Sequence, residues 1–534
     1  MTVRKSVLVI LCFLLMSGLL LAQTNTSTPP QPPGALGDPN NELGGGALAR
    51  KKVYVSPGHG NYWHTSLGWI YQRPDCYGLI EDIHNNEIVV SYLQRYLYNA
   101  GATAFNCRER STQLGHVVVD STPEQGAPEY TEPQGAWTTT TSTGLGYNGG
   151  RYRYAYTDVG GTTAMARWSP TISTAGFYSV WVWYYSSTNR ANNALYRITH
   201  SGGTTEVRID QSGMSSRWVW LGEFHFSTQN AATATQFAEL SNYCPGQAGK
   251  VVIADAVRIG AGNGSIVRGG TTSNKLRSLE ASRYWLEYVG APSSVYNYYS
   301  TGEDNSDDVV CRPLYADWQG GDLYLSIHTN AGGGTGTDTF IHDTSPSPGS
   351  ADLRRRVHRS VIEHVRNTNG YNYPSWVDRG EKEANFGEVR EVDTMPATLI
   401  ELAFHDKQTP DNDFLHEDEF RHLVARSLYK GIVKYFADAD GAGGIEAVYV
   451  PLPPRNFRVR NIGGGTVRLD WDSTPDNIVG ASWPGWDWVA AAPDRYKVYR
   501  STNGMGFDNG STTTNSFLEI NGLPVNTVYY FRVT

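Results

Sequence analysis

The chain has 534 residues, of which 40% are hydrophobic and 18% are charged, and its formal net charge is −8. This length exceeds what one hydrophobic core usually supports, so we expect several domains. The acidic balance supplies no basic face, which excludes nucleic acid as an expected partner.

The first residues have the pattern of a secretory signal. Arg4 and Lys5 precede an apolar run from Val7 to Leu21, and Ala22-Gln23 offers a small-residue cleavage site. The run is short and terminal, which favours a signal peptide over residues 1–22, with an uncleaved anchor as the alternative. No later segment is long and apolar enough to cross a bilayer. We therefore expect a protein that is secreted or lies in the periplasm or cell envelope, with no stable transmembrane anchor.

An α/β pattern begins after a polar tether. Residues 23–50 are rich in Thr, Asn, Pro and Gly and predict a disordered linker. A short apolar strand follows from Val53 to Ser56, then a helix from about Glu81 to Ala100, then a strand from Ala102 to Cys107. Apolar residues recur at helical spacing through the helix, and Gly101 stands where a C-terminal cap belongs.

The middle of the chain changes character. Residues 117–259 form short alternating strands separated by Gly, Ser, Thr and Asn, a pattern typical of a β-sandwich. The α/β pattern then resumes, with expected helices over 274–289, 351–367 and 418–436 and expected strands over 323–327 and 397–402. We therefore predict an α/β domain with an open twisted sheet flanked by helices, formed by residues 51–110 and 265–437, into which an all-β sandwich of residues 115–262 is inserted.

The last part of the chain predicts a separate β unit. Residues 438–453 are rich in Gly and Pro and are expected to be a linker. Beyond them Thr466 to Trp471 alternates apolar and polar residues, as a half-buried strand does. We expect residues 454–534 to form an immunoglobulin-like β-sandwich.

The cysteines leave the disulfide pattern open. The mature chain would keep four of them, which allows three pairings, and sequence does not choose among these. None are paired at the two-residue spacing of a zinc ribbon. The four are Cys76, Cys107, Cys244 and Cys311.

Residues of the α/β domain suggest a metal site. His59 closes the first strand, Glu81 opens the first helix, and His328 ends the strand that begins at about Leu323. Ligands of open parallel sheets bind at the carboxyl ends of the strands, so these side chains can converge there. Two imidazoles and one carboxylate suit zinc and leave a position for water. Glu401 ends another apolar strand at the same edge, where an unliganded carboxylate is a natural general base.

Each of these residues has a simpler interpretation when taken alone, since a single histidine near a glycine turn is more often a surface or core residue. His84 lies on the same helical face as Glu81 and would serve as an alternative ligand or, more often in such sites, as a partner of the Glu81 carboxylate. His64 is expected in a loop. Asn85 and Asn330 would either hold the site or cap a helix or turn.

Four segments, in order, resemble the signature of the N-acetylmuramoyl-L-alanine amidase family of the amidase-3 type. They are Val53-Tyr-Val-Ser-Pro-Gly-His59-Gly, Glu81-Asp-Ile-His-Asn85, Leu325-Ser-Ile-His328-Thr-Asn-Ala331 and Met395-Pro-Ala-Thr-Leu-Ile-Glu401-Leu-Ala-Phe404. The resemblance implies that His59, Glu81 and His328 bind Zn²⁺ and that Glu401 is catalytic. It also implies hydrolysis of the peptidoglycan amide bond between N-acetylmuramic acid and L-alanine.

Two positions depart from that family pattern. Asp82 stands where the family usually has Lys, and His405-Asp406-Lys407 stand where it often has Ser-Asn after the last motif. These departures leave the expected metal site intact. They are positions at which the substrate could differ from that of the family.

The two accessory units also resemble known families. The inserted block resembles a golvesin-like β-sandwich, through stretches such as Gly176-Phe-Tyr-Ser-Val-Trp-Val-Trp-Tyr184 and Ala254-Asp-Ala-Val-Arg258, and an aromatic face there would stack on glycan rings. The last block resembles a fibronectin type III domain, through Trp471 and Tyr496-Lys-Val-Tyr499-Arg500. Its final strand is expected to lie beyond Thr534, so we expect the domain to be truncated.

Two other functions stay open at this level. The chain would be a non-catalytic wall- or polysaccharide-binding protein if its site were inactive. It would be a zinc amidase for another acylated amine if its altered residues after Phe404 change the substrate.

Overall fold

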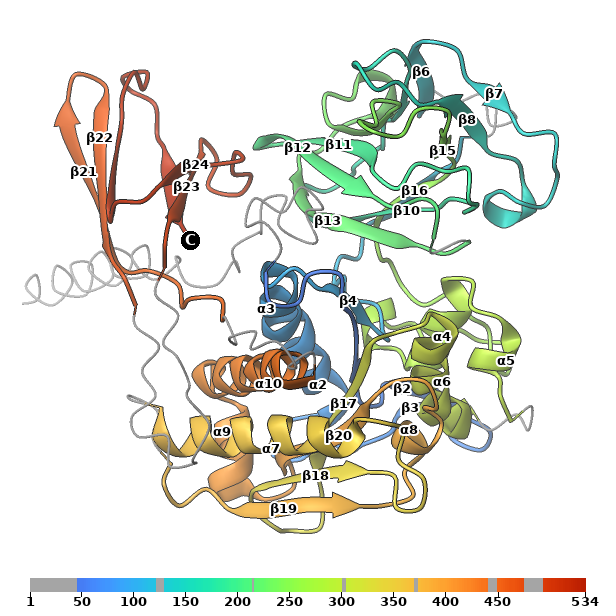
Figure 1. Ribbon diagram of the computed structural model, residues 1–534, viewed down its shortest axis with the longest axis vertical. Coiled ribbons are helices and arrows are strands. Elements are labelled where there is room, and N and C mark those ends of the chain that lie inside the picture. The colour runs from blue at the N-terminus through green and yellow to red at the C-terminus, as the bar shows by residue number, and fades with distance from the viewer. Residues whose placement is uncertain are drawn as a thin grey trace, which may run out of the picture. The chain divides into compact units, whose positions relative to one another are not determined.

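The computed structural model describes residues 46–121, 129–213, 216–299, 304–368, 373–439, 449–474 and 493–534 (Figure 1). The predicted signal peptide and most of both predicted linkers lie outside these ranges.

A mixed six-stranded sheet forms the centre of the α/β part. The strand order is β19 (Asp378–Glu383), β18 (Thr337–Ile341), β20 (Ala397–Phe404), β17 (Leu323–Asn330), β1 (Lys52–Pro57) and β4 (Thr103–Asn106). Strand β1 pairs in parallel with β4 on one side and with β17 on the other. Segments from before and after the β-only block therefore build one sheet. Strand β18 runs antiparallel to β20, so the sheet is not purely parallel as the βα pattern suggested.

Alternate residues of the central strands enter two separate cores. Val53 and Val55 of β1 pack with the helices α2 (Glu81–Ile88), α3 (Gln94–Asn99), α7 (Ser350–Asn367) and α10 (Asp418–Ala439). Tyr54 between them packs on the opposite face with α4 (Ser282–Tyr288), α5 (Ser293–Tyr296) and α6 (Asp304–Trp318). Because successive strand residues point to opposite faces, this division shows a sheet with helices on both sides.

Short elements complete the α/β part. The hairpin β2 (Asn61–His64) and β3 (Gly68–Tyr71) follows β1, and a π-helical turn η1 (Val89–Leu93) joins α2 to α3. Near the end of the domain lie α8 (Gly387–Arg390), the turn η6 (Gln408–Asn412) and α9 (Asp413–Leu415).

The predicted helices over 81–100, 351–367 and 418–436 are confirmed, whereas the one over 274–289 is mostly wrong. Only α4 is helical there, preceded by a short 3₁₀ turn η5 (Arg277–Leu279). The Arg277 guanidinium donates to the carbonyls of Ala261 and Asn263, which ties this segment to a loop. Helix α6 was not predicted, because Pro313 lies inside it and interrupts a helical pattern.

Both predicted linkers are shorter than expected at the ends that the structure describes. Leu48 is fully buried in the α/β core, and its backbone N–H donates to the Ala100 carbonyl at 2.9 Å. Tyr449 is buried in the same core, and the Val450 N–H donates to the Tyr429 hydroxyl at 2.9 Å. Burial of these apolar side chains orders residues that polar and glycine-rich composition alone had assigned to tethers.

The β-only block contains two larger sheets that share one core. One sheet has the order β13-β10-β16-β5 and the other β12-β11-β14-β9-β6, beside a small sheet β15-β8-β7. Tyr178 and Val180 from the first and Trp168 and Tyr196 from the second lie in one buried cluster. The strands are β5 (His116–Val119), β6 (Tyr130–Gln134), β7 (Thr138–Thr139), β8 (Arg153–Tyr156), β9 (Met165–Trp168), β10 (Gly176–Val182), β11 (Ala194–His200), β12 (Gly203–Ile209), β13 (Val219–Phe226), β14 (Phe237–Ser241), β15 (Val251–Ala254) and β16 (Val257–Gly260), with short 3₁₀ turns at Tyr147–Gly149 and Ala231–Thr233.

The C-terminal part has two three-stranded sheets, ordered β21-β22-β25 and β24-β23-β26. Leu469 and Trp471 of β22 pack against Tyr496 and Val498 of β23, so the alternation seen in the sequence does bury one face. The strands are β21 (Arg455–Gly463), β22 (Thr466–Asp472), β23 (Tyr496–Ser501), β24 (Ser511–Thr513), β25 (Phe517–Ile520) and β26 (Tyr530–Val533).

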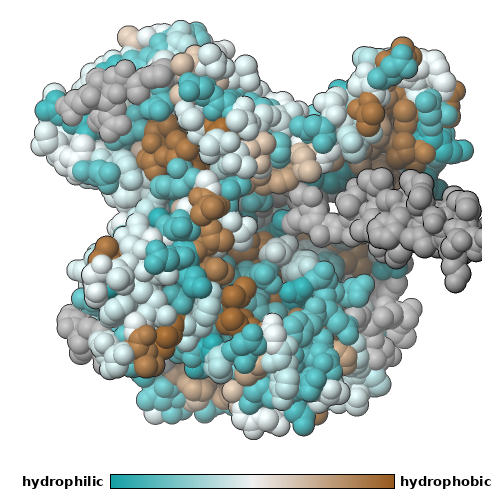
Figure 2. All heavy atoms as spheres, turned by 180° about the vertical axis from the view of Figure 1, so that it is seen from behind, coloured by the Kyte–Doolittle hydropathy of each residue, from teal (hydrophilic) through white to brown (hydrophobic). Residues whose placement is uncertain are grey.

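The four cysteines of the described chain are free thiols, so none of the three pairings is present. Among the described residues, no helix combines the length and apolar character that a membrane crossing requires. On the face shown in Figure 2, hydrophilic side chains predominate and apolar ones gather in separate patches.

Candidate metal centre

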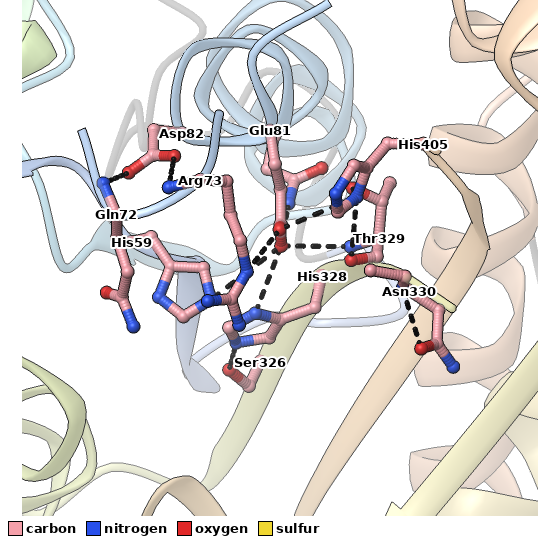
Figure 3. A network of polar contacts seen from close by, with 12 residues as sticks. His59, Gln72, Arg73, Glu81, Asp82, Ser326, His328, Thr329, Asn330 and His405 are labelled. Atoms are coloured by element: carbon pink, nitrogen blue, oxygen red, sulfur yellow. Dashed lines mark hydrogen bonds and ion pairs between the residues drawn. The ribbon is translucent and has the colours of Figure 1, made fainter. Parts of the chain in front are cut away.

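Three side chains from distant parts of the chain converge at the carboxyl edge of the sheet. His59 follows β1, Glu81 is the first residue of α2, and His328 lies near the end of β17. Each offers one ligand atom, and these atoms lie within 4.8 Å of one another (Figure 3). The pairing of β1 with β17 brings the two histidines together, so the sheet itself assembles the cluster.

The turn after β1 is shaped around His328. A Cβ atom on Gly58 would lie 2.2 Å from Cε1 of the His328 ring, so only glycine admits the imidazole there. His59 itself has a φ of 63°, in the left-handed region that non-glycine residues rarely adopt. The two rings then meet edge to face, with centroids 4.7 Å apart.

The Glu81 carboxylate is fully buried and has polar neighbours on both oxygens. Oε1 accepts the Thr329 backbone N–H at 3.1 Å and the Asn85 side-chain N–H at 3.2 Å. Oε2 lies 3.3 Å from Nε of Arg73 and 3.7 Å from Nδ1 of His405. Burial raises the pKa of Glu81, and the nearby His405 and Arg73 oppose that rise.

Both histidines are held as neutral imidazoles. Burial lowers the pKa of His59 well below its usual value and that of His328 to about 3. Within the described chain, neither ring nitrogen of His59 has a hydrogen-bond partner. Buried polar atoms are normally satisfied, so unpaired imidazole nitrogens beside a carboxylate fit a divalent metal. Two imidazole nitrogens and one carboxylate are one of the ligand sets found in catalytic zinc sites.

Glu401 lies beside this cluster on the next strand. It stands opposite His328 in the β17–β20 register and opposite Asp338 in the β20–β18 register. Burial raises the pKa of Glu401 well above its usual value, and the charges of Glu81 and Glu388 raise it further. Its Oε2 accepts no hydrogen bond from the described residues. A carboxyl with a raised pKa next to a candidate metal site suits proton transfer.

Asp82 holds the loops around the cluster in place. Its carboxylate accepts backbone N–H groups from Gly60 at 2.6 Å, from Gln72 at 3.2 Å and from Arg73 at 3.1 Å. Burial raises its pKa to about 7, with the adjacent Glu81 charge acting in the same direction. The residue that departs from the family pattern therefore fixes the chain directly after His59.

The other histidines and asparagines lie elsewhere. His84 does not belong to the cluster, and its Nε2 lies 2.8 Å from the Leu415 carbonyl. His64 is the last residue of β2, so the expectation that it lies in a loop is wrong, and its Nδ1 accepts two backbone N–H groups of the turn that follows. Asn85 contacts Glu81, whereas Asn330 bonds to Asp338 and points away from the cluster in Figure 3.

Three neighbours of the site were not identified from sequence. Arg73 reaches Glu81 with its side chain 39% exposed, and Glu388 and His405 approach from α8 and from the end of β20. His405 was noted only as a departure from a pattern. For Arg73 and Glu388 no local signal exists, because charged residues on loops and short helices are ordinarily solvated.

Two known families match parts of the chain. Residues 271–434 match the N-acetylmuramoyl-L-alanine amidase family, and residues 117–261 match the golvesin C-terminal domain. The first match contains His328 and Glu401 but neither His59 nor Glu81, which the structure adds through β1 and α2. These matches support the enzyme class N-acetylmuramoyl-L-alanine amidase for the α/β part.

Individual relatives cover limited parts of the chain. The N-acetylmuramoyl-L-alanine amidase CwlM of Bacillus licheniformis is 32% identical over 151 residues, which are 28% of this chain and 55% of that protein. The sporulation-specific N-acetylmuramoyl-L-alanine amidase of Bacillus subtilis (strain 168) is 35% identical over 117 residues, which are 22% of this chain and 41% of that protein. The chain therefore spans about half the length of these curated relatives. A solved N-acetylmuramoyl-L-alanine amidase from Clostridium difficile 630 is 26% identical, with a TM-score of 0.21 over 24% of this chain and 64% of that one.

Proposed function

We propose that this protein is a zinc-dependent N-acetylmuramoyl-L-alanine amidase that hydrolyses the amide bond between N-acetylmuramic acid and L-alanine in peptidoglycan. The observation that carries the proposal is the convergence of His59 and Glu81 with His328. The first two come from outside the segment that matches the amidase family, and the third lies within it. Two neutral imidazoles and a carboxylate thus meet from inside and outside the matched segment. We identify no role in folding that would explain this cluster.

In this proposal His59, Glu81 and His328 hold the ion. Zinc bound there would polarise the scissile carbonyl and lower the pKa of a water molecule. The Thr329 N–H and the Asn85 side chain orient the Glu81 carboxylate through Oε1. The protein thus supplies a rigid, buried ligand set in which the imidazoles stay neutral.

Glu401 acts as the general base and then as the general acid. Its carboxylate takes a proton from the attacking water and returns it to the leaving amine of L-alanine. Burial and the nearby carboxylates raise the pKa of Glu401, which makes its carboxylate a stronger proton acceptor than an exposed one. Its place opposite His328 on the adjacent strand supports this role.

The accessory units have their own proposed roles. We infer that residues 115–262 are an inserted golvesin-like β-sandwich, supported by the two sheets around one core, and that it contacts glycan. Residues 454–534 are proposed to form a fibronectin type III domain, supported by Trp471 at the centre of its core. A cell-wall substrate places the protein outside the cytoplasm, in the envelope or secreted.

The test is cleavage of purified peptidoglycan sacculi by the full chain, with zinc and then with chelator, and identification of the new termini by mass spectrometry. Release of stem peptides that begin with L-alanine, dependent on zinc and lost in Glu401→Gln, is the expected result. Bound zinc with cleavage only of other acylated amines would replace the substrate. Absence of both zinc and cleavage would instead support a wall-binding protein.

A further inference from the structure

A second buried carboxylate lies on the far side of His328 from the metal cluster. Nδ1 of His328 lies 3.3 Å from Oε1 of Glu81, on the side of the cluster. Nε2 lies 3.5 Å from Oε1 of Glu388, a residue of the short helix α8. The Ser326 hydroxyl is also near this nitrogen, at 3.1 Å. The two nitrogens of one imidazole therefore face two different carboxylates.

Glu388 is itself held by a buried cation. Nη2 of Arg312, on α6, lies 3.5 Å from Oε1 of Glu388 and 3.4 Å from Oδ2 of Asp308. The Arg312 side chain is fully buried, and its Nε donates to the Asp308 carbonyl at 2.7 Å. A carboxylate with its side chain 7% exposed is costly to bury alone, and this guanidinium is a buried partner of opposite charge.

We propose that Glu388 is a positioning residue for the metal centre: its carboxylate accepts the Nε2–H of His328 and so fixes the tautomer in which the lone pair of Nδ1, on the side of Glu81, is free for a metal. This inference rests on the metal site of the proposed function. Metal-bound imidazoles are usually oriented in this way, because a carboxylate on the second nitrogen fixes the ring and makes the first nitrogen more basic.

Geometry separates this role from direct ligation. The cluster of atoms within 4.8 Å of one another contains His59, Glu81 and His328, and Glu388 does not belong to it. His328 and Arg312 both reach the same Oε1 of Glu388. Strand β17 is thereby joined to α6 and α8 through one oxygen, whereas His59 has no such support within the described residues.

The experiment measures zinc affinity without relying on turnover. The full-length protein and the variants Glu388→Ala and Glu388→Gln are titrated against a chromophoric zinc chelator, and the melting temperature of each metal-free protein is recorded as a check of folding. We expect the zinc affinity to fall roughly 10- to 100-fold in Glu388→Ala and less in the near-isosteric Glu388→Gln. Glu391→Gln, which removes a carboxylate paired with Arg390 near the end of the same helix, is the matched control and should bind zinc normally.

A spectroscopic readout tests the tautomer directly. In long-range ¹H–¹⁵N spectra of the zinc-loaded, histidine-labelled protein, His328 should show a protonated Nε2, and exchange broadening of that proton should appear in both Glu388 variants. Should Glu388→Ala destabilise the fold, Glu388→Gln decides the question, because it keeps the volume and removes only the charge.

Two results would overturn the inference while leaving the enzyme intact. One is equal zinc affinity in the parent protein and both Glu388 variants. The other is a large loss in Ser326→Ala with none at Glu388, which would make the hydroxyl the true partner. If instead zinc affinity depends on Glu388 but no peptidoglycan is cleaved, the positioning role stands and the proposed function fails.

Discussion

The segment before the β-only block and the segment after it build the candidate metal centre in different ways. Before the block, His59 has a φ of 63° and no side-chain hydrogen bond to a described residue, and its Nε2 lies 3.9 Å from Oε1 of Glu81. After it, His328 has polar partners on both nitrogens, from Ser326, Glu81 and Glu388. One histidine is therefore positioned mainly by main-chain geometry and packing, and the other mainly by buried polar groups.

This difference predicts which substitutions displace each histidine. The position of His59 should change when the loop around it or a close contact is altered, even if no polar group is lost. The position of His328 should instead change when a charged partner is replaced by a neutral residue of the same volume. Substitutions of the two kinds can therefore be compared on one scale, the zinc affinity.

The largest effect is expected from removing either histidine. His59→Ala and His328→Ala each delete one of three protein ligands, so zinc should fall from about one ion per chain to near zero after dialysis, and amidase activity should fall to background. Metal analysis of the purified variants checks this. Tight zinc binding by His59→Ala would mean that the segment before the insertion does not supply a ligand.

Glu401→Gln should separate catalysis from metal binding. The change keeps the shape of the side chain but removes the proton acceptor, so kcat should fall about 10²- to 10⁴-fold while the zinc content stays normal. Steady-state kinetics and metal analysis on the same preparation measure both. A variant that loses zinc together with activity would make Glu401 a ligand and not the base.

The sequence was most informative where a residue type typical of metal sites stands at the end of a predicted strand or at the start of a predicted helix. His59, Glu81 and His328 stand at the ends or starts of β1, α2 and β17, and their convergence follows from the known edge at which parallel strands present ligands. The order of the strands was known only from the structure. No local sequence pattern indicates that β1 pairs with β17, because the β-only block lies between them in the chain.

What could not be predicted depends on contacts between distant segments. Glu388 on α8 meets Arg312 on α6, and α6 was itself hidden by Pro313. His405 lies beside Glu81 only because β20 ends next to β17. No sequence spacing reveals such contacts between distant segments. A charged residue on a short helix is also ordinarily solvated, so it gives no sign of a buried partner.

A smaller effect is expected at Gly58, which tests the backbone side of the comparison. In Gly58→Ala the new Cβ would lie 2.2 Å from the His328 ring and would force it to move. Because a misplacement of about 1 Å can cost about 10²-fold in rate, we expect kcat to fall by up to that factor with weaker zinc binding. Gly161→Ala, where no atom lies within 4 Å of the new Cβ, is the matched control. Unchanged activity in Gly58→Ala would show that the ring tolerates displacement.

The smallest effect should come from His405, which supports Glu81 from its second oxygen. Nδ1 of His405 lies 3.7 Å from Oε2 of Glu81, too long for a hydrogen bond, and 3.1 Å from the Thr329 hydroxyl. His405→Ser therefore removes a neighbouring dipole and some packing but no direct bond to the ligand, while Thr329 and Asn85 still hold Oε1. We expect zinc affinity to fall no more than about tenfold, below the loss in Glu388→Ala. Chelator competition measures both on one scale, with the exposed His416→Ser as control. A larger loss at His405 than at Glu388 would contradict this order, because the centre would then depend more on the orientation of Glu81 than on the tautomer of His328.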